Sequence, residues 1–154
     1  MSGCRFCAER SRSAMARACA AVLCCMVLAS CGLRKSRIVA EQGVRDFHAL
    51  LNKEQYEAIY DASDDSLKRT WARADFVKYL AEVHSQLGPA RKAATRGFQV
   101  NAQTGQGAEV ALEMETEFQR GLAEERFIWR VNGDHAVLLD YRADIRRSSG
   151  PRTV

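Results

Sequence analysis

Cysteine is absent from the sequence after residue 31, and histidine and proline are scarce throughout. The six cysteines are Cys4, Cys7, Cys19, Cys24, Cys25 and Cys31. A domain formed by the later residues therefore has no disulfide bond and no thiolate metal site. The three histidines, His48, His84 and His135, are far apart, and no pair has the spacing of a helical metal-binding motif. We therefore expect no metal ion and no other cofactor.

An uncharged apolar run at residues 18–29 is too short to cross a membrane. It contains 12 residues, whereas a spanning helix needs about 20 and the apolar part of a signal peptide needs roughly 7 to 15. Basic residues precede the run. Residues 1–30 are therefore predicted to be a signal peptide, whose true start is Met1 or Met15.

The run ends in Leu28-Ala29-Ser30-Cys31-Gly32, which is typical of a lipobox, the signal for lipidation of the cysteine and cleavage just before it. Small residues before the cut admit extended backbone to the processing enzymes, and Leu28 is the apolar residue that the site requires. An ordinary secretory signal that is cleaved near a cysteine is the alternative. Gly32, rather than Asp, follows the cysteine, which favours the outer membrane over retention in the inner membrane. We expect a lipid anchor on Cys31 at the periplasmic face of the outer membrane, with the inner membrane and the cell surface as alternatives.

The basic charge of the chain lies mostly in this leader. The 23 basic and 19 acidic residues give a net charge of +4, and removing the four arginines and one glutamate of residues 1–30 leaves 19 and 18, a net charge of +1. The rest of the chain lacks the basic surplus of nucleic-acid-binding domains. We expect no nucleic-acid partner.

The remaining chain divides into a basic tether at residues 31–37, one domain at 38–146 and a frayed tail at 147–154. Apolar residues at helical spacing predict helices at about 37–52 and 73–87, with short helical pieces at 53–60 and 67–71. The period then changes to two, which predicts strands at about 91–102, 110–118, 126–131 and 136–145. The connections between the strands are short, and Asn132-Gly133 is the preferred sequence of a type I′ hairpin turn. The fold class is therefore α+β, with N-terminal helices packed on a four-stranded antiparallel meander sheet.

A lipobox followed by helices and then by a curved antiparallel sheet resembles small bacterial lipoproteins with an uncharacterised nuclear-transport-factor-2-like (cystatin-like) domain. The resemblance covers residues 38–146 and includes Leu87-Gly88 before the strands and Leu139-Asp140-Tyr141 in the last one. It implies a cone-shaped domain with a cavity between the concave face of the sheet and the helices. The superfamily contains ketosteroid isomerases and dehydratases together with many non-catalytic modules.

Aromatic and polar residues of the predicted helices and strands are the candidates for lining such a cavity. They are Phe47, His48, Tyr56, Tyr60, Trp71, Tyr79, Trp129 and Tyr141. Asp140 is the candidate base, because its apolar neighbours would raise the pKa of its carboxyl. Alternation, however, places it opposite Leu139 and Tyr141, on the solvated face. No other catalytic constellation is found.

Three carboxylates of one predicted strand, Glu113, Glu115 and Glu117, share a face of the sheet. Arg126 and Arg130 on the following strand are their natural partners across the sheet. A solvated, charge-paired outer face is therefore expected in place of a cation site.

Three functions are compatible with these features. The first is a membrane-anchored, non-catalytic domain that binds an unknown envelope protein or a small apolar ligand. The second is a ketosteroid-isomerase-like enzyme, which requires an acid inside the cavity within hydrogen-bond reach of a tyrosine. The third is an assembly module that forms a homodimer through the open face of its sheet.

Overall fold

The computed structural model describes residues 32–103 and 107–146, and the compact unit that carries the fold begins at Ser36. The predicted signal peptide, the lipidation site at Cys31 and the tail at 147–154 lie outside the described residues.

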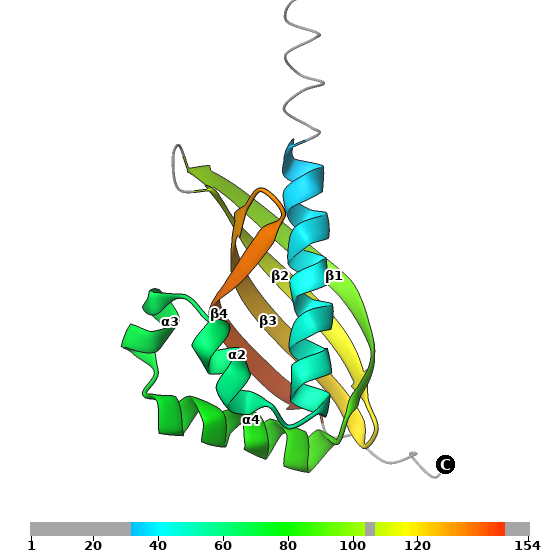
Figure 1. Ribbon diagram of the computed structural model, residues 1–154. Coiled ribbons are helices and arrows are strands. Elements are labelled where there is room, and N and C mark those ends of the chain that lie inside the picture. Colours follow the sequence, from blue (N-terminus) through cyan, green and yellow to red (C-terminus); the bar gives the residue numbers. More distant parts are fainter. Residues whose placement is uncertain (1–31, 104–106, 147–154) are drawn as a thin grey trace, which may run out of the picture. The chain divides into compact units, whose positions relative to one another are not determined.

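The described chain forms four helices followed by four strands (Figure 1). The first helix covers residues 32–52 and is called the N-terminal helix here. The others are α2 (Tyr56–Ala62), α3 (Asp65–Thr70) and α4 (Arg73–Leu87). The strands are β1 (Ala90–Gln103), β2 (Gly107–Phe118), β3 (Gly121–Asn132) and β4 (His135–Arg146). They form one antiparallel sheet in the order β1-β2-β3-β4, so the predicted α+β meander is confirmed.

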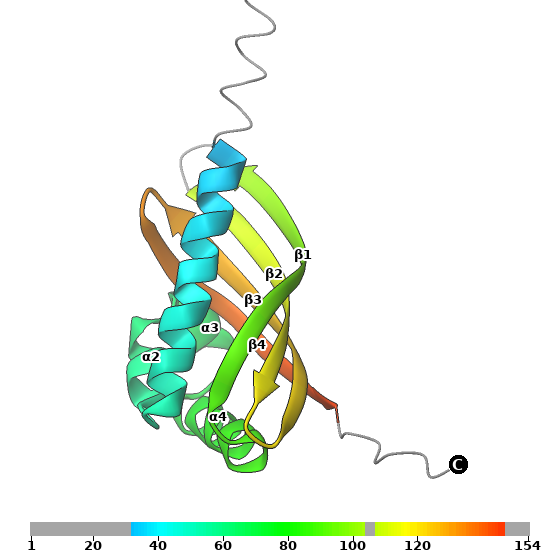
Figure 2. The ribbon, with the colours of Figure 1, turned by 90° about the vertical axis from the view of Figure 1, so that its right-hand side faces the viewer.

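The N-terminal helix packs its apolar stripe on the sheet. Ala40, Val44, Phe47 and Leu51 recur every three or four residues, and all four are buried. Figure 2 shows this helix along one face of the sheet, with α2 and α3 on the same side. Residues 32–37, which were predicted to be a tether, are helical as well.

The helix approaches the sheet closely at Gly43. A Cβ atom at this position would lie 3.1–3.2 Å from ring carbons of Trp129. Side-chain hydrogen bonds join the helix to the first strand on either side of this point. Thr95 Oγ1 donates to Glu41 Oε1 at 2.9 Å, and the Asn52 amide pairs with both backbone groups of Ala90 at 2.8 and 2.9 Å.

Alternation along β2 and β3 places apolar residues on the buried face and charged residues on the other, as the sequence predicts, with Glu125 as the exception. The buried residues are Val110, Leu112, Met114, Thr116, Phe118, Ala123, Glu125, Phe127, Trp129 and Val131. In β4 the predicted alternation is wrong. Ile128 pairs with Asp140 and Trp129 with Leu138, so Leu139 is an extra residue in a β-bulge. The bulge changes which side chains before it face the core. The buried residues of β4 are therefore Leu138 and Tyr141, and Leu139 does not share the buried face with Tyr141 as predicted.

The predicted hairpin turn at Asn132-Gly133 is shifted by one residue in the structure. Asn132 pairs with His135, so the second loop is Gly133-Asp134. Gly133 has φ +60° and Asp134 has no positive φ, as in a type II′ turn, whereas type I′ needs both central residues in that region. The first loop is Gln119-Arg120, whose amides donate to Pro89 and Leu87 at 3.0 and 2.8 Å and fasten this turn to the end of α4.

No helix within residues 32–103 and 107–146 is both long enough and apolar enough to cross a membrane.

Candidate functional site

A carboxylate, an imidazole and a phenol meet inside the domain. Glu125 on β3 is 2% exposed and lies between His48 of the N-terminal helix and Tyr141 of β4. His48 Nε2 lies 2.8 Å from Glu125 Oε2, and the Tyr141 hydroxyl donates to Glu125 Oε1 at 2.7 Å. Each carboxylate oxygen therefore has its own partner, one from a helix and one from a neighbouring strand. We call these three residues the Glu125 network.

Aromatic rings enclose the Glu125 network. Phe47 lies against Tyr141 with ring centroids 4.6 Å apart, and Phe127 lies 4.9 Å from Tyr141. This burial, together with the neighbouring Glu125, raises the pKa of the Tyr141 phenol well above its ordinary value. The phenol is therefore a hydrogen-bond donor at neutral pH, and its acceptor is the carboxylate.

The Glu125 network can hold and move a proton between the carboxylate and the imidazole, because the two groups are in direct contact. Its access to solvent is narrow. The side chains of Glu125 and His48 are 0% and 10% exposed, and Tyr141 is fully buried. Glu125 is also among the residues that line a hollow of about 320 Å³ in the sheet. Because both of its carboxylate oxygens have partners inside the domain, the geometry resembles a structural link between the helix and the sheet more than an open acid–base site.

Seven of the eight predicted cavity-lining residues pack into one aromatic cluster. Trp71 stacks on Tyr79 at 5.5 Å between centroids, and Tyr79 lies 6.0 Å from Tyr141. Phe47, His48, Tyr60 and Trp129 join the cluster through Phe76, Phe127 or Tyr141. The hydroxyl of Tyr60 donates to the Trp71 carbonyl at 3.1 Å, and that of Tyr79 accepts from the Ala143 amide at 2.8 Å. Burial raises the pKa of Tyr79, and nearby Asp144 and Glu125 add to the increase.

Tyr56 is the eighth residue, and it lies elsewhere. Its hydroxyl is 3.0 Å from His84 Nδ1, at a surface hollow of about 420 Å³ between α2, α4 and the turn after α4. Burial, with help from Glu54 and Glu57, raises the pKa of Tyr56. His48 and His84 therefore lie at separate places in the fold, the first beside Glu125 and the second beside Tyr56.

Asp140 lies on the outer side of β4, as predicted, where its Oδ2 is 3.4 Å from Arg142 Nε. The other acids of this face only partly follow the predicted pairing. Glu113 is opposite Arg126, but Glu115 is opposite Glu124 and forms its ion pair with Arg96. Arg130 is opposite Glu109 and pairs with Asp64, the N-cap of α3.

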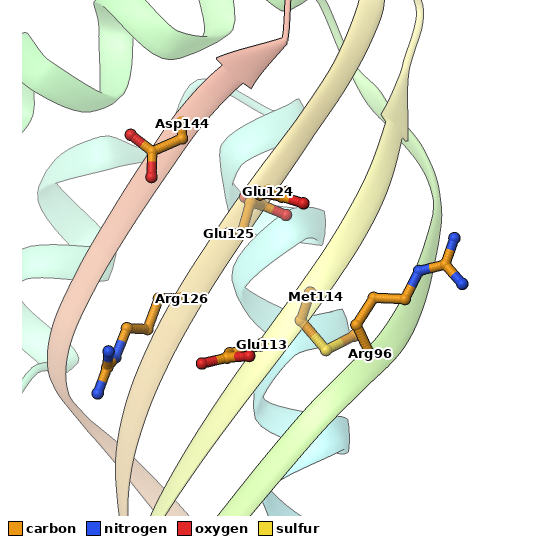
Figure 3. A pocket seen from close by; sticks show the side chains of 7 residues that line it. All are labelled: Arg96, Glu113, Met114, Glu124, Glu125, Arg126 and Asp144. Atoms are coloured by element: carbon orange, nitrogen blue, oxygen red, sulfur yellow. The ribbon is translucent and has the colours of Figure 1, made fainter.

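A hollow of about 320 Å³ lies among these strands (Figure 3). In this view the N-terminal helix is behind the sheet, so the face that is seen is the one without helices. Arg96, Glu113, Arg126 and Asp144 come from all four strands. Met114, Glu124 and Glu125 complete the lining, so four carboxylates face two guanidinium groups there and the hollow has an excess of acidic side chains.

A second hollow, of about 390 Å³, lies beside His48, where the N-terminal helix meets the start of β1. We call it the basic hollow. Its lining residues are Arg45, His48, Ala49, Asn52, Ala90, Arg91, Lys92 and Ala93.

Glu125 is the site residue that the sequence analysis missed. The predicted strand begins at Arg126, whereas β3 begins at Gly121. Extended back by two residues, the alternation of Phe127, Trp129 and Val131 places Glu125 on the buried face. A glutamate at an inward position of a strand needs a buried partner, and the sequence contains that signal.

In the part of the chain that the structure describes, no three His, Cys, Asp or Glu side chains lie close enough together to hold a metal ion. No protein-family model matches the sequence, and no curated protein matches it. The chain is therefore characterised by its α+β fold and by its own residues.

Proposed function

We propose that this chain is a lipoprotein whose acylated Cys31 anchors it to the periplasmic face of the outer membrane. We further propose that its domain, of the cone-shaped nuclear-transport-factor-2-like type, is a non-catalytic binding module of the cell envelope. The observation that carries the proposal is the short path from the lipobox to the core. Helix follows Cys31 from residue 32, and residues 32–39 alone separate Cys31 from Ala40, the first buried residue. At about 1.5 Å per helical residue, such a connection holds a domain near its lipid.

The state of the interior supports a non-catalytic role. The aromatic side chains that were expected to line a cavity pack against one another, and the Glu125 network satisfies its own polar groups. The four hollows described in the structure lie at the surface and include charged lining residues. These features favour recognition at the surface over an apolar ligand inside the domain.

The experiment is metabolic labelling of the chain with radioactive palmitate in a bacterial host, followed by membrane fractionation. We expect label and outer-membrane partition for the wild type and loss of both for Cys31→Ala. Cys25→Ala is the matched control, because it removes a cysteine of the leader outside the lipobox and should keep both. Equal labelling and partition of the wild type and Cys31→Ala would overturn the anchored part of the proposal.

One observation favours the enzyme as a second candidate. The ketosteroid-isomerase-like hypothesis requires an acid beside a tyrosine inside the domain, and Glu125 Oε1 lies 2.7 Å from the Tyr141 hydroxyl. The test is the isomerisation of a β,γ-unsaturated ketosteroid, followed by the absorbance of the conjugated product. Turnover that is lost in Glu125→Gln would establish the enzyme, and equal background rates would remove it.

The homodimer remains a prediction of the sequence analysis. The molecular mass of the chain in a nonionic detergent, measured by light scattering, tests it directly.

A further inference from the structure

The basic hollow has the composition of an anion-binding site. Arg45, Arg91 and Lys92 supply three positive charges, and none of its lining residues is acidic. Small side chains, Ala49, Ala90 and Ala93, leave the space between the cations open. The volume of about 390 Å³ is large enough for a small ligand.

The cationic side chains of the basic hollow form no ion pair with a carboxylate of the described residues. Among the described residues, neither Arg91 nor Lys92 has an ion-pair partner, although Glu117 stands opposite Lys92 in the sheet. Arg45 donates from Nε and Nη2 to the neutral Gln42 Oε1 at 2.9 and 2.7 Å, so its charge is not neutralised. Arginine and lysine that are held close together without a carboxylate attract an anion.

The walls of the basic hollow are fixed in place. Asn52 holds the end of the N-terminal helix to Ala90 through two hydrogen bonds, which sets the distance between the two walls. The Nε2 edge of His48 contacts Glu125 in the core, and the same ring lines the hollow. A ligand in the hollow would therefore contact a residue that belongs to the Glu125 network.

We propose that the basic hollow binds a phosphate group, either free or as the headgroup of a lipid. Three uncompensated cations match a phosphate monoester, which carries up to two negative charges, better than a single carboxylate. A guanidinium group also fits two phosphate oxygens at once. The inference does not depend on the lipidation of Cys31 or on the absence of catalysis.

The experiment is a titration of the full chain in nonionic detergent, followed by nuclear magnetic resonance at constant ionic strength. Inorganic phosphate is the first probe, and acetate is the monoanionic comparison. In a second arm the chain is placed in phosphatidylcholine bicelles with or without phosphatidic acid, whose headgroup is a phosphate monoester. We expect saturable shifts of the signals of His48, Arg91 and Lys92.

Two double variants decide the result. Arg91→Gln/Lys92→Gln should weaken binding about tenfold or more, because two of the three charges are lost. Lys78→Gln/Arg142→Gln makes the same change in charge at exposed positions elsewhere and should bind as the wild type does. Saturation by inorganic phosphate assigns a free phosphate, and saturation only with phosphatidic acid assigns a lipid headgroup. Shifts that do not saturate in either arm, that acetate reproduces, or that both double variants retain would overturn the proposal.

Discussion

Tyr141 shows how one hydroxyl contributes to the stability of the core. The substitution Tyr141→Phe removes this hydroxyl and keeps the ring. Glu125 Oε1 is then buried without a hydrogen-bond donor. An unsatisfied buried acceptor costs about 1–3 kcal/mol, so the free energy of unfolding at neutral pH should fall by about that amount. Urea denaturation measures it. Tyr60→Phe is the control, because it removes the hydroxyl that donates to the backbone carbonyl of Trp71. Its free energy of unfolding should fall by less than that of Tyr141→Phe.

The same residue gives a pH dependence with a definite sign. Burial and Glu125 raise the pKa of Tyr141 in the folded state well above the value of about 10 for a free phenol. Its neutral form therefore stabilises the fold fully below about pH 10, and this contribution is lost as the pH rises through the folded pKa. The difference in free energy of unfolding between the wild type and Tyr141→Phe should be constant near neutral pH and shrink above about pH 10. A difference that grows in alkali would contradict the assignment.

Gly43 allows the N-terminal helix and the sheet to approach each other closely. Alanine is a better helix residue by about 1 kcal/mol, but its Cβ would lie 3.1–3.2 Å from the buried ring of Trp129. The ring is packed against Phe127 and has little room to move, so we expect Gly43→Ala to destabilise the protein by about 1 kcal/mol.

Trp129→Phe tests this explanation because it removes the part of the ring that Gly43 meets. In that background Gly43→Ala should become neutral or stabilising, and thermal or urea unfolding of the four proteins completes a double-mutant cycle. Additive effects of the two substitutions would show that the contact is not the cause.

Arg120 joins a turn of the sheet to the end of a helix. Its guanidinium group donates to the carbonyls of His84, Ser85 and Gln86 in the last turn of α4. We expect Arg120→Ala to cost about 1 kcal/mol, since these carbonyls lose a cationic donor. Arg120→Lys should recover only part of the loss, because an ammonium group cannot reach several carbonyls in the same way. Arg142→Ala, an exposed ion-pair residue, is the control and should change little in the same urea titration.

For the molecule as a whole, the sequence predicts the elements and their order better than the site. Hydrophobic periodicity is local, and it located the helices and the four strands of the meander. The bulge at Leu139 was not predicted, because it depends on how β4 pairs with β3 and the β4 sequence alone still alternates. The Glu125 network joins residues 77 and 16 positions apart in the chain, and such distances have no local pattern.

The N-terminal helix and the sheet should unfold as one unit. Four features tie them together: the buried stripe of the helix, the pair of His48 and Glu125, the bond between Glu41 and Thr95, and the attachment of Asn52 to Ala90. Opening the helix alone would expose the buried face of the sheet to water and break the hydrogen bond between His48 and Glu125, which is costly. In hydrogen exchange, we therefore expect the amides of Val44 and Leu51 to have the same free energy of opening as those of Phe127 and Tyr141.

His48→Phe supplies the contrasting case, because it keeps a ring in the core but leaves Glu125 Oε2 without its partner. A buried acceptor left without its hydrogen-bond partner costs about 1–3 kcal/mol, and protection should fall together in the helix and the sheet. Replacing the network at all three positions, with His48→Phe, Glu125→Leu and Tyr141→Phe, should restore much of that loss, since no polar group of the network is then left buried and unpaired. Faster exchange confined to the helix, in the wild type or in His48→Phe, would contradict a single cooperative unit. It would show instead that the helix opens from the sheet while the strands stay paired.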